Sequence, residues 1–299
     1  MRSFLLFVAL LAGALIVASA VTYPAWLLVS LISVEPVHRV MNRVAMLIAL
    51  IGLVVLTRRL GLSDRESMGY GMPRRRFVRQ LIVGWVAGFL LMAPLVAFLM
   101  GLDIRELRPA FDGNWGSIVL GGVISGLVVA FIEETFFRGV LFSALSRTSG
   151  PLAAVLAPSL LYASLHFLGG RLRVPAEEVS WEHGFLVLAR LFERYAEPLV
   201  FLDSFLALTM LGVLLALIRL RTGAIAACIG LHAAGVCTIA VLRKATEVDA
   251  TAAYAGWVGN YDGVIGWAAL LWFIMIAIGY ERLQYRRSHR MARNEESSS

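Results

Sequence analysis

The sequence predicts an all-α, polytopic membrane protein of about eight transmembrane helices. Of its 299 residues, 59% are apolar and only 16% are charged, whereas about a quarter of the residues of a soluble globule are charged. The mean hydropathy is +0.78. The apolar residues form blocks of roughly 17 to 30, long enough to cross a bilayer. A soluble domain, a disordered chain and a β-barrel, whose strands alternate every second residue, are excluded.

Eight apolar windows mark the expected transmembrane helices. They lie near residues 4–33, 43–57, 80–100, 117–145, 152–168, 198–218, 223–242 and 264–280. We expect the first span to be broken around Pro24, because proline removes one helical hydrogen bond. In the longest loop, 169–198, the apolar stretch 184–192 predicts a helix lying at the membrane interface. We see no internal repeat and expect one membrane domain over 1–299, ending in a polar cytoplasmic tail over 281–299.

The basic charge of the chain is a property of its loops. The net charge is +7, from 27 Lys or Arg and 20 Asp or Glu, and the isoelectric point is near 9.9. With the N-terminus in the cytoplasm, sixteen of the 27 cationic residues fall in cytoplasmic segments and ten in outer segments. This bias follows the positive-inside rule. The bias predicts both termini in the cytoplasm, which for a bacterial-type protein means the inner membrane, and it gives no support to a nucleic-acid partner.

The first 20 residues also resemble a secretory signal, with Arg2, an apolar stretch and then Ala18-Ser19-Ala20. Cleavage there would leave only residues 21–34 before the charged Glu35, which is too short a piece to span a bilayer. We therefore expect this segment to be retained. The two cysteines, Cys228 and Cys237, share one apolar run and predict no disulfide framework.

Ionisable side chains inside the spans are the candidate functional residues, because each is costly in a bilayer. The fourth span carries Glu133, Glu134 and Arg138, the fifth His166 and the seventh His232. Glu134 and Arg138 are four residues apart on one helix face, with the acid first, and this predicts an ion pair. Glu133 has no such neighbour and needs a partner on another helix or a proton. A buried structural network of these charges is the alternative interpretation.

The expected depths bring Glu133, His166 and His232 together. Measured from the cytoplasmic ends of their spans, at about 1.5 Å per residue, they lie roughly 18, 21 and 14 Å deep. A desolvated carboxylate and an imidazole can activate water, and a second imidazole can polarise a carbonyl, so hydrolysis of an amide is the natural chemistry. The same three side chains form a catalytic zinc ligand set, and the spacing leaves both alternatives open. Ser164 and Cys228 are less attractive as nucleophiles.

Three motifs in this region resemble the CAAX-protease and bacteriocin-processing (CPBP, or ABI) family of intramembrane endopeptidases. The motif Glu-Glu-x-x-x-Arg is matched by Glu133 to Arg138, with Gly139 following. The motif Phe-x-x-x-His is matched by Tyr162 to His166, with Tyr in place of Phe. The motif in which His is followed four residues later by Asn or an apolar residue is matched by His232 to Val236. The three occur in the family's order over about residues 117–242.

The resemblance implies an eight-helix bundle around a polar intramembrane cavity, with residues 117–242 as its catalytic core. It implies that Glu133 and His166 activate water, that His232 stabilises the oxyanion, and that Glu134 and Arg138 support the site. Family members with Asn at the position of Val236 are thought to use it as a second oxyanion donor. Its replacement here favours the broader bacterial branch over a eukaryotic-type prenyl-protein processor.

The expected activity is therefore an intramembrane endopeptidase that cleaves a membrane-associated peptide or protein. The resemblance leaves a glutamate-dependent mechanism and a metal-dependent one open, so zinc or another divalent metal is a candidate cofactor, held by Glu133, His166 and His232. A non-proteolytic scaffold or bacteriocin-immunity-type protein of the same fold is the first alternative. A proton-coupled carrier is the second, although the chain has no inverted repeat of the kind found in many carriers.

Overall fold

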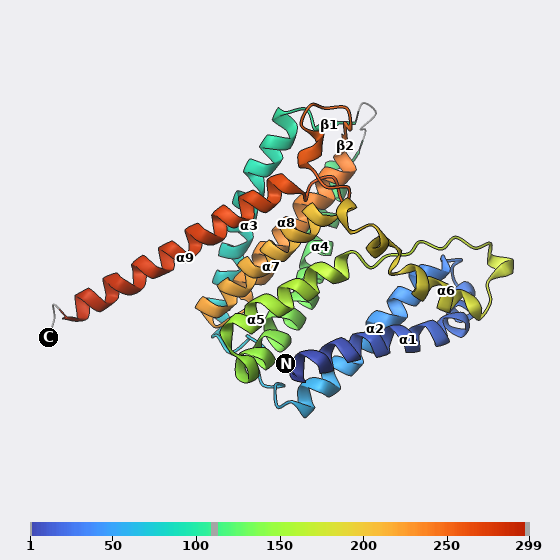
Figure 1. Ribbon diagram of the computed structural model, residues 1–299, viewed down its shortest axis with the longest axis horizontal. Helices are drawn as coiled ribbons and strands as arrows, with labels where there is room; N and C mark the ends of the chain where they lie inside the picture. The colour runs from blue at the N-terminus through green and yellow to red at the C-terminus, as the bar shows by residue number, and fades with distance from the viewer. Residues whose placement is uncertain (1, 109–112, 297–299) are drawn as a thin grey trace.

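The computed structural model describes residues 2–108 and 113–296, and helices dominate it (Figure 1). The α-helices are α1 (Arg2–Ser30), α2 (Val37–Arg59), α3 (Arg74–Gly101), α4 (Trp115–Glu134), α5 (Phe142–His166), α6 (Glu182–Arg190), α7 (Leu202–Thr222), α8 (Ala226–Ala245) and α9 (Trp267–Glu296). A π-helical segment, η1 (Thr135–Leu141), joins α4 to α5. The short 3-10 helices are η2 (Ala176–Glu178), η3 (Glu193–Ala196), η4 (Pro198–Val200) and η5 (Ala255–Trp257).

The predicted membrane class is confirmed. All eight predicted spans fall on helices, and six helical stretches among the described residues are long and apolar enough to cross a membrane. One of these is the continuous stretch Trp115–His166, which contains the predicted fourth and fifth spans. The chain turns within it at Gly150, whose φ of 85° is left-handed and is followed directly by Pro151. The predicted boundary between these spans is therefore a kink inside α5.

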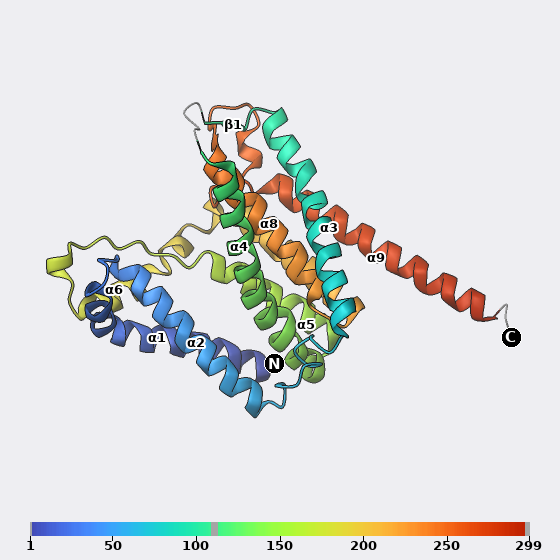
Figure 2. The same ribbon diagram turned by 180° about the vertical axis from the view of Figure 1, so that it is seen from behind.

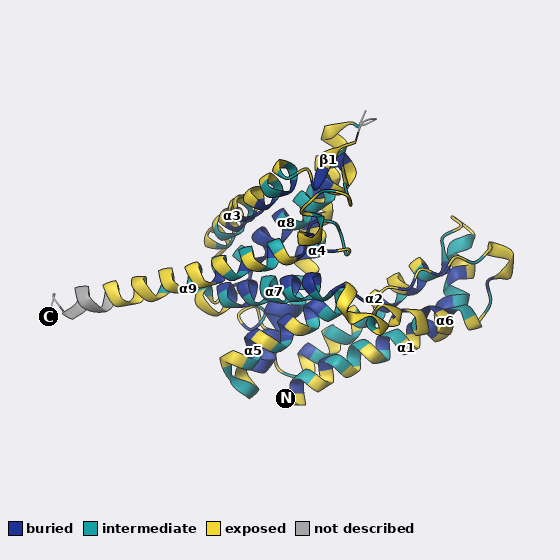
Figure 3. Ribbon diagram, turned by 45° about the horizontal axis from the view of Figure 1, so that its top comes forward, coloured by how far each residue is buried: buried dark blue, intermediate teal, exposed yellow. Residues whose placement is uncertain are grey.

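The main body of the bundle is built around α7 and α8, which carry many of its buried residues (Figure 3). Helices α3 and α4 pack on α8, whereas α5 and α9 pack on α7. Helices α1, α2 and α6 form a second group that extends to one side of this body, as Figures 1 and 2 show. This group has its own apolar cluster, and Phe7 of α1 links it to the main core through Phe136.

Glycines let α3 and α4 lie unusually close to α8. A Cβ atom on Gly84 would stand 2.3 Å from a carbonyl oxygen of α8, and one on Gly88 would stand 2.6 Å from another. On α4, the same atom on Gly126 would stand 2.4 Å from the carbonyl oxygen of Ala233. Small residues spaced in this way bring membrane helices into backbone contact. Here they bring α3 and α4 against the stretch of α8 that carries His232.

The expected break at Pro24 is wrong, because α1 continues through it from Arg2 to Ser30. In lipid, a broken helix would expose backbone groups that have no other hydrogen-bond partner. A transmembrane helix therefore tends to continue through a proline. The hydroxyls of Ser19 and Thr22, just before the proline, donate to carbonyls one turn earlier on the same helix. Both hydroxyls thus form hydrogen bonds while the backbone of α1 stays helical.

The ends of the bundle carry the remaining elements. Strands β1 (Arg105–Leu107) and β2 (Thr246–Val248) pair antiparallel, with Glu106 opposite Glu247. The helix expected at 184–192 is α6, and it packs against α1 and α2. Residues 281–296 of the predicted tail continue α9 as a helix, and the last three residues of that tail lie outside the described residues.

Candidate active site

The core of the site is a buried chain of three charged or polar side chains from α4, η1 and α8. Glu134 Oε1 accepts a hydrogen bond from Arg138 Nη1 at 3.0 Å, and it lies 2.8 Å from His232 Nδ1. Glu134 and Arg138 are fully buried, and His232 is 4% exposed. The predicted ion pair is therefore present. Because the same carboxylate oxygen already accepts from Arg138, we assign it as the acceptor of His232 also, which places the imidazole proton on Nδ1 and presents Nε2 outward.

Arg138 is held by groups from two further helices. Its Nη2 donates to the carbonyl oxygen of Gly212 on α7 at 3.1 Å, and its guanidinium lies over the Tyr162 ring, 4.8 Å from the centroid. A cation over an aromatic face is attracted to the ring's negative quadrupole. The carbonyl of Arg138 is in turn bonded by Arg219 Nε at 3.1 Å. These contacts fix the motif arginine between α5 and α7.

The π-helical segment begins immediately after the two glutamates. Helical segments with this wider winding are rare and frequently occur at functional sites, because they shift the side chains that follow relative to a regular helix. At Gly139, inside this segment, a Cβ atom would stand 2.8 Å from the carbonyl oxygen of Met68, so only glycine lets the loop before α3 pack here. The motif thus sits where the helix geometry changes.

Glu133 points to the same histidine from the other side. Its Oε2 lies 3.7 Å from His232 Nε2, which is longer than a hydrogen bond. The carboxylate is 27% exposed, but this oxygen is buried and has no hydrogen-bond partner among the described residues. Glu133 therefore approaches a residue of α8 without a hydrogen bond to it. A free acceptor beside an imidazole that lines a cavity is what water activation requires.

His166 reaches the site through Tyr162, one turn earlier on α5. His166 Nδ1 lies 2.7 Å from the Tyr162 carbonyl oxygen, which can only accept, so the proton is on Nδ1 and Nε2 is free. The Tyr162 ring lies 4.4 Å from the His166 ring and 5.9 Å from the His232 ring, between centroids. The structure thus brings Glu133, Glu134, Arg138 and His232 into one network and places His166 beside it across a shared tyrosine.

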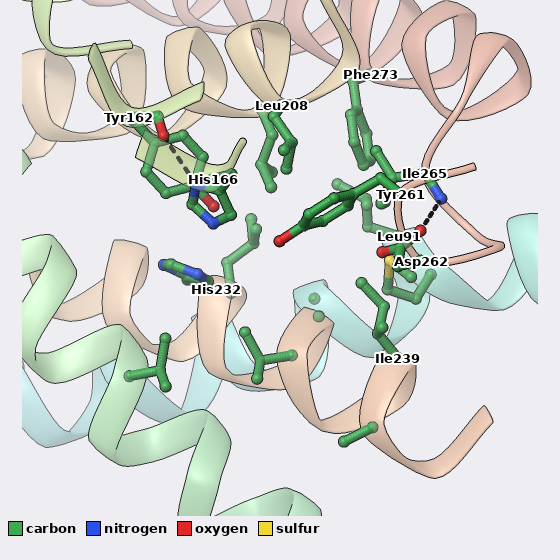
Figure 4. A pocket seen from close by; sticks show the side chains of 18 of the residues that line it. Leu91, Tyr162, His166, Leu208, His232, Ile239, Tyr261, Asp262, Ile265 and Phe273 are labelled. Carbon is green, nitrogen blue, oxygen red and sulfur yellow. Dashed lines mark hydrogen bonds between the residues drawn. The ribbon is translucent and has the colours of Figure 1, made fainter. Parts of the chain in front are cut away.

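A cavity of about 270 Å³ opens from the two histidines toward the loop between α8 and α9 (Figure 4). Its lining is largely apolar. One wall is a face of α8 that runs from His232 past Val236 to Arg243, and the far end is formed by Tyr261 and Asp262. The same three residues, Arg243, Tyr261 and Asp262, also line a larger surface hollow of about 810 Å³. The cavity is therefore a passage from that surface to the imidazoles.

Two of the residues at the cavity mouth have perturbed ionisation. Burial, and after it the charge of Asp262, raises the pKa of Tyr261 to about 12. Burial also raises the pKa of Asp262, although its backbone hydrogen bonds and the nearby charges of Arg243 and Arg105 oppose the shift. Both side chains are thus favoured in their neutral forms relative to the same groups in water.

The alternative nucleophiles and the expected metal ligands do not lie in positions that suit those roles. The hydroxyl of Ser164 donates to the Leu160 carbonyl, and the thiol of Cys228 donates to the Leu215 carbonyl; both are turned onto their own or a neighbouring backbone. Among the described residues, no group of three His, Cys, Asp or Glu side chains is placed to hold one metal ion. As they stand, Glu133, His166 and His232 do not fit zinc, and we derive no step through a metal.

Sequence reasoning missed several residues that shape the site. Arg219 was expected in a cytoplasmic segment, but it lies in the last turn of α7, is only 6% exposed and holds the carbonyl of Arg138. Tyr261 and Asp262 lie in a loop, where no hydrophobic period marks them. The sequence around them, Asn260 to Gly263, is rich in turn-forming residues and predicts only a turn between two spans. Asp203 lies in the first turn of α7 and lines the outer hollow.

The fold and the site together define a helical membrane protein with a buried Glu–Arg–His network beside a cavity. Residues 115–237 match the family described as Rce1-like, type II CAAX prenyl endopeptidase. The match confirms the resemblance that the three motifs predict, and at the level of the family it supports an intramembrane endopeptidase of the CAAX-protease type. No curated protein and no solved structure matched the chain.

Proposed function

We propose that the protein is an intramembrane endopeptidase that hydrolyses a peptide bond of a membrane-associated peptide or protein without a covalent intermediate. The observation that carries the proposal is the unpartnered carboxylate oxygen of Glu133, buried beside His232, which itself lines the cavity. A buried acceptor with no partner is costly, so its position is best explained by a water molecule that it binds and activates. The family match supports the same reaction class.

In the proposed reaction, Glu133 takes a proton from water while the free Nε2 of His166 orients that water. Water oxygen bonds to the carbonyl carbon, and the carbon–nitrogen bond then breaks with a proton passing to the leaving amine. His232, fixed by Glu134, lines the cavity beside Glu133 and is proposed to lie next to the carbonyl group under attack. Glu134 and Arg138 hold His232 in one tautomer and orientation, a supporting role that needs no contact with substrate.

The substrate is proposed to be an extended segment with apolar side chains. Most of the cavity wall is apolar, whereas Arg243 and Asp262 stand at the mouth. We propose that both termini are cytoplasmic, because most cationic residues then lie in cytoplasmic segments. The mouth is formed by the loop between α8 and α9, and the N-terminus and the α7–α8 turn lie at the other end of the main helices. In this orientation the substrate reaches the site from the side opposite the termini.

The test compares the wild type with Glu133→Gln and His166→Ala, and with Glu177→Gln as a matched control at an exposed position of η2. Peptides and new protein termini are profiled in membranes of cells producing each form. In parallel, each purified protein in lipid nanodiscs is given internally quenched peptides that end in cysteine, two aliphatic residues and one variable residue, with and without a C15 prenyl group. We expect products from the wild type and Glu177→Gln that are absent with the other two variants.

Products that persist in Glu133→Gln would contradict the proposal, and so would no cleavage by the wild type in either experiment. The second result would favour a scaffold or immunity-type protein that uses the same polar cluster to bind a partner. Metal analysis of the purified protein, with hydrolysis measured before and after chelation, decides the zinc alternative. Full activity after chelation in metal-free protein is expected.

A further inference from the structure

Tyr261 reaches into the site from a segment outside the three motifs. It lies in the loop between α8 and α9 and lines the cavity together with His166 and His232. Figure 4 shows its hydroxyl pointing toward the two imidazoles. Its ring meets the His166 ring edge to face at 6.2 Å and packs at 5.1 Å against Phe167. None of the hydrogen bonds between described residues uses this hydroxyl, which therefore has a proton to donate into the cavity.

The two histidines cannot fill the role of donor in their neutral forms. The Nδ1 proton of His166 bonds the Tyr162 carbonyl, and that of His232 bonds Glu134, so each presents an acceptor nitrogen to the cavity. Arg243 is a donor, but it lies eleven residues beyond His232 on α8, about 16 Å along the helix. The Tyr261 hydroxyl is thus a neutral donor that faces the histidines from the cavity side, and Tyr162 is the other tyrosine that lines this cavity.

The loop fixes Tyr261 in place. Asp262 Oδ1 accepts hydrogen bonds from the backbone N–H groups of Val264 and Ile265, at 2.9 and 2.8 Å. The buried Arg105 donates to the carbonyl of Gly263 at 2.8 Å, and Gly263 has a left-handed φ of 71°. Gly263, Val264 and Ile265, which follow Tyr261 closely in the chain, are therefore held by hydrogen bonds from β1 and within the loop itself. A donor held in advance stabilises developing charge without a reorganisation cost.

The ionisation of Tyr261 suits a donor. Burial and the charge of Asp262 raise its pKa to about 12, so the hydroxyl keeps its proton throughout the neutral range. A group used as a base would need the opposite shift, toward the working pH. The raised value agrees with the geometry, in which the hydroxyl faces two acceptor nitrogens across the cavity.

We propose that the Tyr261 hydroxyl donates a hydrogen bond to the carbonyl oxygen of the scissile peptide and stabilises the oxyanion. The inference rests on the proposed function. As water oxygen bonds to the carbonyl carbon, the carbonyl π electrons move to oxygen and the water proton moves to Glu133. The oxyanion is held by Tyr261 until the electrons return, the carbon–nitrogen bond breaks and the amine takes the proton. Tyr261 keeps its own proton throughout, and one water is consumed for each bond cleaved.

The experiment compares Tyr261→Phe with Tyr254→Phe, a matched control in the same loop whose side chain is exposed. Purified proteins in nanodiscs hydrolyse the quenched peptide that the wild type cleaves fastest, and kcat and KM are determined separately. Loss of one oxyanion donor lowers kcat by about 10² or more in known hydrolases. We expect that fall for Tyr261→Phe, with KM within about twofold of wild type, an unchanged melting temperature, and wild-type behaviour from Tyr254→Phe.

Two results would overturn the role of Tyr261 while leaving the proposed function intact. One is a kcat of Tyr261→Phe within twofold of wild type, with Glu133→Gln inactive. The other is a faster reaction in Tyr261→Ala, which would make the ring a plug in the passage. If no cleavage by the wild type is lost in Glu133→Gln, the proposed function is contradicted, and the role of Tyr261 is contradicted with it.

Discussion

Replacing Arg138 with methionine tests whether the buried network stabilises the fold. Arg138 and Glu134 are both 0% exposed and are joined at 3.0 Å. Methionine preserves most of the apolar stem but leaves Glu134 as a buried charge with His232 as its remaining partner. Breaking a buried pair on one side costs about 3–5 kcal/mol, because the other charge is left uncompensated. We expect Arg138→Met to lose that much unfolding free energy.

The control is Arg221→Met on the same bundle. Arg221 pairs with Glu281, but these side chains are 44% and 32% exposed. An exposed pair of this kind contributes only about 0–1 kcal/mol, since water and salt screen it. The comparison separates the loss of a buried charge partner from the general effect of removing an arginine from a helix.

Unfolding free energy is measured by denaturant titration in mixed micelles, with thermal melting as a second readout. Adding Glu134→Gln to Arg138→Met removes the stranded charge and keeps an oxygen that accepts from His232. The double variant is therefore expected to recover part of the lost stability. The reasoning is refuted if Arg138→Met is no more destabilising than Arg221→Met, or if the double variant is less stable than Arg138→Met alone.

Two further predictions concern the cavity mouth and the topology. Because burial raises the pKa of Asp262 above its ordinary value of 3.8, its contribution to stability is complete below that value and is lost as pH rises through the raised pKa. Asp262→Asn keeps an acceptor for the Val264 and Ile265 amides but has no charge to bury. The unfolding free energy of the variant minus that of the wild type should therefore be more favourable to the variant at pH 7 than at pH 4; a difference more favourable at pH 4 would contradict this. In sealed spheroplasts of a Cys228→Ala/Cys237→Ala background, Ser288→Cys should resist a membrane-impermeant maleimide and Glu247→Cys should react; labelling of Ser288→Cys instead would invert the orientation.

Much of the architecture was predictable from hydropathy. The apolar windows fall on helices because a membrane helix must satisfy its backbone internally, and their lengths follow from the bilayer. The spacing of Glu134 and Arg138 predicted their ion pair, since four residues return to the same face. The continuity of α1 through Pro24 was not predictable by the soluble-protein rule used, because lipid offers an opened helix no alternative partner.

The site was only partly predictable. Hydropathy says how deep a residue lies but not how its helix is rotated or tilted, so it could not show that both glutamates converge on His232. The π-helical segment at Thr135–Leu141 packs at Gly139 against the loop before α3, a long-range contact that the local pattern does not mark. Tyr261, Asp262 and Arg105 come from loop and strand segments with no periodic pattern. Their positions depend on contacts between segments far apart in the sequence, and no local sequence pattern predicts such contacts.

The most direct test of the proposed function is hydrolysis by purified protein in nanodiscs, with Glu133→Gln beside the exposed-site control Glu177→Gln. Loss of a general base lowers rates by about 10²–10⁴. We predict cleavage of a membrane-anchored peptide by the wild type and Glu177→Gln at comparable rates, with Glu133→Gln slower by at least about 10² and folded like wild type. Equal rates for wild type and Glu133→Gln would contradict the assignment of Glu133 as the base that activates water.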